Sequence, residues 1–398
     1  MQKNLPDLFI QISYDEFLFV ACKQGESNGN KILYKNKIPA AGILKNQITD
    51  IEILTQTLKE NIFKIEKKLD TIFKEAILIL DIFNFKIINL SGFKKLNGAQ
   101  LSKENITFIL NDLKTKVIET EKDKIILHIF NSNYTLDKKE IFNLPIGLFG
   151  NFYTHELSFF LIDKNDFKNL ISAFERCNLK IRKTILKSFV EGVNLIHNTD
   201  NLTTFFKIEI NPLNSKIIYF ENSSFKYAQD FNFGSELLIK DIAKITSLNR
   251  KNIEKFILDT NFDKDKIDTE DFIEKEYFNN ENFRKIRKKL IYDIILSRLE
   301  EFAELLLFKN INLKRLISKD KQIYLQIIDP YFKSFKEIYE KCFSLNRNFQ
   351  LNFYKETNDE DVFNDASKIV HFGWNKEAIP VVQTKKTIIA RFFDLLFK

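Results

Sequence analysis

Apolar runs separated by short polar segments mark the stretch between residues 203 and 241. Its apolar runs predict strands at 205–210, 217–220 and 225–227, and the Asn-rich and Ser-rich segments between them predict tight turns. After Gly234 the apolar spacing changes to three or four residues, which indicates that a helix begins there. The predicted order is therefore strand, turn, strand, turn, strand, glycine and helix.

The same patterns place elements along the rest of the chain. Strands are predicted at 8–13, 16–21, 31–36, 76–83, 85–90, 124–130, near 134, at 155–162 and at 321–327. Helices are predicted at 50–73, 103–119, 166–178, 185–196, 283–309, 332–342 and 366–374. The polar segment 259–282 is expected to be an exposed loop or a short helical hairpin. Mixed strands and helices of this kind predict an α/β protein with a small α+β insertion at 82–163.

The last twelve residues have a wide apolar arc and a narrow polar face. A short segment that contains Pro380 precedes them, and Lys385 and Lys386 give them a basic flank. This pattern is typical of a helix that lies in a membrane interface, and the competing interpretation is a last helix folded onto the protein core. The residues assigned to the membrane contact are Ile388, Ile389, Arg391, Phe392, Phe393, Leu395, Leu396, Phe397 and Lys398.

Composition and charge limit the classes of function. A chain of 398 residues with 44% hydrophobic content is long enough for two to four packed domains. The net charge of +7 comes from 61 basic and 54 acidic residues without a dense basic block, which argues against nucleic-acid binding and suits an anionic membrane surface. The three cysteines are far apart and the four histidines show no ligand spacing, so we expect a reducing cytosol and no metal. No signal peptide or membrane-spanning run is predicted.

Short motifs in a fixed order resemble FtsA, an actin-related family of bacterial cell-division proteins, over nearly the whole chain. They are the segment LHIFNSNYTLD followed by Pro145–Gly150, the segment Glu175–Leu179, Gly234-Ser235 ahead of Asp241–Ala243, Arg298–Glu301, and the terminal helix. The resemblance implies an α/β, actin-like (ribonuclease H-like) two-lobed fold with an inserted SHS2-type domain and a C-terminal amphipathic helix.

The resemblance also implies a division of the chain into parts. The expected boundaries are 1–81 with 164–200 for the first lobe, 82–163 for the inserted domain, 201–232 with 318–374 for the second-lobe core, 233–317 for its subdomain, 375–386 for a tether and 387–398 for the membrane helix. The implied function is to anchor the FtsZ ring to the cytoplasmic face of the bacterial inner membrane at the division site, and to polymerise. The implied partners are FtsZ, held by Arg298 and Glu301, further copies of the chain, and other division proteins bound by the inserted domain.

The expected nucleotide loops depart from the family pattern. The first has lost its acidic residue and glycine, and the second, a glycine-rich run in the family, falls on 209–214. In the third loop, Ile327 and Ile328 stand where the family has a pair of glycines. Because glycines allow backbone N–H groups to approach phosphate closely, ATP and Mg binding, which the family implies, is expected to be weakened or lost. The candidate residues of this degenerate cleft are Ser13, Glu209, Asn211, Asn214 and Gly234.

Several alternatives stay open. Glu209 is either a surviving metal-coordinating carboxylate or an ordinary polar residue at a strand end, and Arg298 with Glu301 is either a partner site or a solvated helix face. The chain could be a nucleotide-binding ATPase of the actin family, or a scaffold such as the type IV pilus protein PilM. We assign no catalytic residue and lean toward a protein that is not an enzyme.

Overall fold

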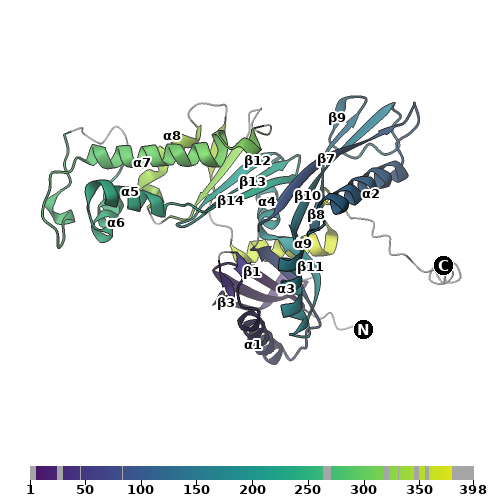
Figure 1. Cartoon of the computed structure of the whole chain (residues 1–398), viewed down its shortest axis with the longest axis horizontal. Helices are drawn as coiled ribbons and strands as arrows, with labels where there is room; N and C mark the ends of the chain where they lie inside the picture. The colour runs from purple at the N-terminus through teal and green to yellow at the C-terminus, as the bar shows by residue number, and fades with distance from the viewer. Residues whose placement is uncertain are drawn as a thin grey trace. The chain divides into compact units, whose positions relative to one another are not determined.

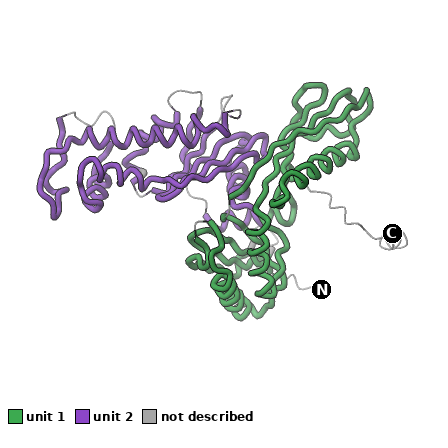
Figure 2. Tube along the Cα trace, viewed as in Figure 1, with its two compact units in different colours: residues 1–185, 368–398 green, residues 186–367 purple. Residues whose placement is uncertain are grey.

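The computed structural model describes residues 6–24, 30–44, 46–82, 84–262, 270–314, 316, 322–329, 331–344, 349–354 and 358–378. They form two compact units, residues 1–185 with 368–398 and residues 186–367 (Figure 2). The predicted membrane helix 387–398 lies outside the described residues, as does the greater part of the predicted tether. Within the ranges given above, no helix is long and apolar enough to cross a membrane.

The first unit contains a five-stranded sheet, of which β1, β3 and β11 are labelled in Figure 1. The order of its strands is β11-β6-β1-β2-β3. Its strands are β1 (Asp7–Ser13), β2 (Glu16–Gln24), β3 (Asn30–Pro39), β6 (Glu75–Asp81) and β11 (Lys180–Leu186), with a small pair β4 (Ile43–Leu44) and β5 (Gln47–Ile48) nearby in sequence. The helices α1 (Ile51–Leu69) and α3 (Lys164–Glu175) pack against one another. Asp50 caps the N-terminus of α1, because its carboxylate accepts hydrogen bonds from two backbone N–H groups of the first turn at 2.9 Å.

A second, four-stranded sheet in this unit has the order β7-β10-β8-β9. Its strands are β7 (Lys86–Lys95), β8 (Lys124–Leu136), β9 (Lys139–Ile141) and β10 (Phe152–Asp163), and helix α2 (Lys103–Thr120) packs on it. A Cβ atom on Gly92 of β7 would lie 2.5 Å from Ile109, so only glycine allows the helix to approach this closely. Asp137 and Lys138 both have positive φ, as a two-residue hairpin between β8 and β9 requires.

The last described residues join this small sheet at the free edge of β8. The backbone N–H of Ala378 donates to Ile129 at 2.8 Å, and the N–H of Asn131 donates to the carbonyl of Lys376 at 2.7 Å. Between them, a carboxylate oxygen of Glu377 lies 2.8 Å from His128 Nδ1, and the other forms an ion pair with Lys183 at 3.3 Å. The start of the predicted tether is therefore held on β8, while the domain boundaries themselves stay a prediction.

The second unit is built on a five-stranded sheet with the order β14-β13-β12-β15-β16. Its strands are β12 (Phe205–Ile210), β13 (Ser215–Glu221), β14 (Ser224–Phe231), β15 (Gln322–Ile327) and β16 (Gln350–Phe353), and α4 (Lys187–Asn198) packs against β13 and β14. The predicted hairpin from 205 to 227 is confirmed, with Ile208 of β12 directly opposite Ile217 of β13.

The other helices of this unit are α5 (Glu236–Thr246), α6 (Arg250–Asp259), α7 (Lys288–Ala303), a π-helical turn (Glu304–Phe308) and α8 (Phe332–Ser344), together with the short 3₁₀ turns Lys275–Tyr277 and Ile311–Leu313. Helix α9 (Asp359–Phe372) begins in this unit, and its residues from 368 onward belong to the first. Helix α7 packs against both α5 and α8. The three helices bury one continuous apolar cluster against the sheet, with Leu238, Leu299 and Phe335 fully inside it.

Several predicted elements need correction. Strands β11 and β16 were not predicted, and residue 185, the expected start of a helix, lies in β11 instead, which ends at Leu186. Helix α7 begins at Lys288 rather than at residue 283, and α9 begins at Asp359 rather than at residue 366. The segment 259–282 is not simply exposed, because Ile273 and Phe278 are buried in the apolar cluster. Short apolar runs at ambiguous spacing account for these errors.

Candidate functional site

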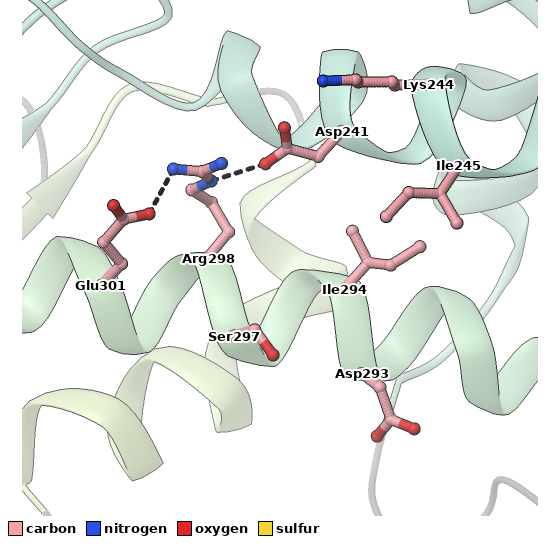
Figure 3. Close-up of a pocket in the computed structure, with 8 residues that line it drawn as sticks. All are labelled: Asp241, Lys244, Ile245, Asp293, Ile294, Ser297, Arg298 and Glu301. Carbon is pink, nitrogen blue, oxygen red and sulfur yellow. Dashed lines mark hydrogen bonds and ion pairs between the residues drawn. The ribbon is translucent and has the colours of Figure 1, made fainter.

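A groove of about 600 Å³ lies between helices α5 and α7. Its lining residues are Asp241, Lys244, Ile245, Asp293, Ile294, Ser297, Arg298 and Glu301 (Figure 3). The groove therefore contains both residues of the predicted partner site, and it is made within one unit of the chain. Ile245 and Ile294 lie at the same end of the groove, and Ile245 keeps 56% of its surface exposed.

Arg298 connects the two helices across the groove. Its Nε donates to Asp241 Oδ2 on α5 at 2.5 Å, and its Nη1 donates to Glu301 one turn further along α7. The Arg298 side chain is about one quarter exposed and that of Glu301 about one half. Exposed pairs of this kind add at most about 1 kcal/mol to stability, so fixing the guanidinium at the groove is their main consequence.

The groove combines one apolar wall with separated charges. Lys244 is exposed beside Ile245, and Asp293 is held by Lys289 through an ion pair of α7. Such a surface suits a short peptide that places an apolar side chain on the isoleucines and a charged group on Arg298 or Lys244.

The polar groups of the loop between β12 and β13 form hydrogen bonds with one another. The backbone N–H of Asn211 donates to the carbonyl of Asn214 at 2.9 Å, and the Asn211 side chain donates to the Asn214 side chain at 2.7 Å. Pro212 has no N–H to offer, and it lies in the middle of the loop. The two asparagines predicted to line a nucleotide cleft are thus brought together, but as partners of each other.

Gly234 places the start of α5 directly against this loop. The N–H of Ser235 donates to the carbonyl of Asn211 at 3.0 Å, and the N–H of Glu236 donates to the carbonyl of Pro212 at 2.9 Å. A Cβ atom on Gly234 would lie 2.0 Å from the Asn211 carbonyl oxygen, so the contact requires glycine. Backbone N–H groups at a helix start can bind phosphate, and here two of them already bind protein carbonyls.

Glu209 belongs to a buried ion cluster. Lys207, two residues earlier on β12, has a side chain that is 1% exposed and forms ion pairs with Glu209 and with Glu191 of α4. Burial raises the pKa of Glu209, but the Lys207 ammonium outweighs it and lowers that pKa to about 2. Burial lowers the pKa of Lys207, and the two carboxylates more than reverse this, so the ammonium stays charged. The carboxylate considered as a metal ligand is therefore neutralised by a lysine.

The other predicted cleft residues lie at strand ends. Ser13 ends β1 in the first unit, is 2% exposed and accepts a hydrogen bond from Gln11 at 3.3 Å. In the second unit, Ile327 ends β15, and the N–H of Ile328 donates to the carbonyl of Ile210 at 3.0 Å. Neither position carries a glycine or an acidic side chain suited to phosphate or Mg. No cluster of metal-ligating side chains occurs among the residues described.

Sequence reasoning missed two residues that complete these sites. Asp241 was noted only as part of a motif, although it is the partner of Arg298 across the groove. Lys207 lies within the strand predicted at 205–210 and is not among the candidate residues, although its position two residues before Glu209 places both side chains on the same face of β12. A lysine and a glutamate at this spacing in a buried strand are a signal that could have indicated the ion pair.

Comparisons with known proteins agree with the resemblance seen in the sequence. The chain is 21% identical over 369 residues to the cell division protein FtsA of Buchnera aphidicola subsp. Acyrthosiphon pisum (strain APS), covering 90% of this chain and 87% of that relative. It is 18% identical over 205 residues to FtsA of Escherichia coli (strain K12), covering 52% of this chain and about half, 48%, of that relative. The chain is thus similar to FtsA along most of its length. No protein-family model matches it.

The fold is also shared with a solved structure. The structure titled "PilM-PilN type IV pilus biogenesis complex" has a TM-score of 0.52 to this chain at 10% identity, and covers 94% of this chain and 98% of the solved one. At this identity the likeness concerns the fold alone. The predicted actin-like α/β fold is confirmed.

Proposed function

We propose that this chain works as a divergent FtsA, a cell-division protein that connects FtsZ to the inner face of the cytoplasmic membrane at the division site. The observation that carries the proposal is the groove between α5 and α7, where Arg298 and Glu301 stand side by side in a chain similar to FtsA. The groove binds the C-terminal peptide of FtsZ. Glu301 is half exposed, so an incoming carboxylate can replace it on Arg298.

Attachment to the membrane is assigned to residues 387–398. Burying one large apolar side chain contributes roughly 1.5–3 kcal/mol, but interfacial insertion is partial and ordering a helix costs entropy. One copy therefore binds an anionic surface weakly. Self-association through the predicted inserted domain, 82–163, displays many tails together, so each further tail engages at a high effective concentration. The same domain is proposed to bind other division proteins.

Nucleotide binding is proposed to be lost or much weakened, and the chain is not proposed to be an enzyme. The support comes from the loop at 211–214, which has a proline where a phosphate loop needs glycine and whose carbonyls accept the first N–H groups of α5. The Lys207 ammonium pairs with Glu209, where the alternative interpretation would place a metal ion. ATP and Mg are therefore not required for the FtsZ contact.

The proposal is tested by titrating a labelled C-terminal peptide of FtsZ with the full-length protein and following fluorescence anisotropy. Micromolar binding that is competed by intact FtsZ is the expected result. A peptide that stays free at all protein concentrations contradicts the assignment of the groove.

A second candidate function is a pilus assembly scaffold, and it is favoured by the fold shared with the PilM-PilN complex. A scaffold of this kind needs neither FtsZ nor a membrane helix. Binding of a PilN-like peptide in the absence of FtsZ binding would favour it. The apolar terminal segment is the sequence feature that argues against it.

A further inference from the structure

One end of the small sheet carries an unusual number of exposed apolar side chains. We define this sheet tip as residues 93–99 and 136–152, where β7 ends, β8 turns into β9 and β10 begins. The exposed large side chains of the tip are Phe93 at 61%, Phe142 at 71%, Ile146 at 44%, Leu148 at 50%, Phe149 at 69% and Phe152 at 37%. Apolar surface concentrated in this way marks a contact with a protein or a membrane.

The sheet tip is held in place by the fold. The N–H of Leu101 donates to the carbonyl of Leu148 at 2.9 Å, and the N–H of Gly147 donates to the carbonyl of Leu101 at 2.8 Å. The rings of Phe93 and Phe152 stack at 5.3 Å between centroids. Apolar side chains on an ordered backbone bind a partner more favourably, because less conformational entropy is lost on binding.

The charges around the tip favour a negatively charged partner. The tip carries the lysines Lys94, Lys95, Lys138 and Lys139 against two acidic residues, Asp137 and Glu140. Asp137 is already used, since its carboxylate accepts the N–H groups of Asn151 and Phe152 at 2.9 and 2.8 Å. Exposed aromatic side chains beside lysines fit an anionic lipid surface, where rings enter the interface and ammonium groups meet the headgroups.

The residues just before the predicted tail contact this same sheet. Residues 376–378 pair with β8, and Lys376 Nζ donates to the carbonyl of Phe142 at 2.7 Å. Eight residues, 379–386, separate Ala378 from the predicted membrane helix. A chain of this length spans at most roughly 28 Å. A tail that lies in a bilayer therefore holds the edge of β8 near the membrane surface.

We propose that the sheet tip is a second membrane contact that inserts Phe142 and Phe149 into an anionic bilayer next to the attached tail. This inference rests on the proposed membrane attachment. The tail itself is a poorer occupant of the tip, because residues 385–398 carry four basic side chains against one acidic residue and would meet the tip lysines. Both segments instead fit the same negatively charged surface, and the second contact strengthens the first through effective concentration.

The first test uses tryptophan fluorescence of the full-length chain. Trp374 is the single tryptophan, so a Trp374→Phe background with Phe149→Trp places one reporter at the tip, and Phe63→Trp on α1 gives a matched reporter on another exposed phenylalanine. Vesicles of phosphatidylglycerol and phosphatidylethanolamine with brominated acyl chains are the probe. Blue-shifted emission and quenching of at least half the signal are expected from the tip reporter, and none from the control.

The second test measures vesicle affinity by sedimentation. The double variant Phe142→Ser with Phe149→Ser is expected to bind at least fivefold more weakly than Phe63→Ser with Phe372→Ser, which changes two phenylalanines of similar exposure in the same unit. Equal affinities, with an unquenched tip reporter on sedimented protein, overturn the inference and leave the tail attachment intact. Protein that does not sediment at all overturns both.

Two further outcomes identify another occupant. A tip reporter that is blue-shifted without lipid, and that loses the shift when Phe393→Asp disrupts the tail, shows that the tail covers the tip. A shift that depends on protein concentration shows that a second copy covers it. Either result contradicts the membrane contact.

Discussion

Arg298 on α7 donates from Nε to Asp241 Oδ2 on α5 at 2.5 Å, and so closes one side of the groove between the two helices. The same guanidinium contacts Glu301 through Nη1. Arg298 thus bridges the two helices and presents one of the two positive charges that line the groove, the other being Lys244. We propose that a partner peptide binds at this contact.

Replacing Arg298 with alanine is expected to weaken binding of the FtsZ peptide at least tenfold, about 1.4 kcal/mol, because the charge that meets the peptide is removed. Stability should change by less than about 1 kcal/mol, since the ion pairs are partly exposed. Anisotropy and urea unfolding measure the two effects. Arg250→Ala is the matched control, because Arg250 also pairs with two carboxylates on this unit but lies outside the groove. Equal peptide affinity in the two variants would argue against the groove.

Millimolar Mg-ATP is expected to leave the melting temperature of the protein unchanged and to produce no binding heat. The N–H groups of Ser235 and Glu236 already donate to the loop carbonyls, so these two donors are not available to phosphate. A ligand at one hundred times its dissociation constant would add about 2.7 kcal/mol to stability, which thermal denaturation detects easily. A micromolar dissociation constant by titration calorimetry would show that the altered loops still bind nucleotide.

Replacing Lys207 with methionine is expected to destabilise the protein by about 3–5 kcal/mol, because two buried carboxylates lose the ammonium between them. Lys289→Met is the control, since Lys289 forms an exposed pair with Asp293 and its loss should cost less than about 1 kcal/mol. In the wild type, Glu209 has a pKa lowered to about 2 by Lys207, although burial acts in the opposite direction. Its contribution is therefore complete above pH 4.5 and is lost as the pH falls toward 2. Equal losses in the two variants would refute the buried cluster.

His155 makes the first unit sensitive to mild acid. Burial, followed by the nearby charge of Lys376, lowers the pKa of His155 from 6.5 to about 4. Below pH 6.5 the His155 imidazole binds a proton in the unfolded chain but stays neutral in the folded protein. The free energy of unfolding therefore falls until the pH reaches about 4. Between pH 7 and 5 this amounts to about 2 kcal/mol.

Urea unfolding at the two pH values measures this loss. We expect His155→Phe to remove most of the decrease, because a phenylalanine keeps the ring contact with Tyr134 and has no proton to bind. His371→Phe, which changes an exposed histidine paired with Asp7, should retain the decrease. An unchanged pH dependence in His155→Phe would contradict the assignment.

Much of the fold follows from local patterns in the sequence. Strand β12 was predicted at the residues it occupies, and the spacing of Leu54, Leu58 and Ile62 was enough to identify α1. Strand β11 was missed because its apolar side chains are Ile181, Ile185 and Leu186, and the last two fall at the start of a predicted helix. Strand β16 was missed because four residues carry too little periodic signal.

The candidate site was predictable only in part. The resemblance to FtsA implied Arg298 and Glu301 as a pair, and residues three apart do share a helix face. Asp241 could not be assigned as their partner, because it lies 57 residues away and meets Arg298 only when α5 packs on α7. The lost glycines were visible in the sequence, whereas the carbonyls that replace phosphate at Ser235 and Glu236 required the backbone geometry.

The most direct measurement is co-sedimentation of FtsZ with anionic liposomes in the presence of the full-length protein or of a version that ends at Val382. The account predicts that FtsZ sediments with the full-length protein, and that the shortened version leaves it in solution while still binding the FtsZ peptide. If neither version brings FtsZ down with the liposomes, the chain has the fold without the proposed function.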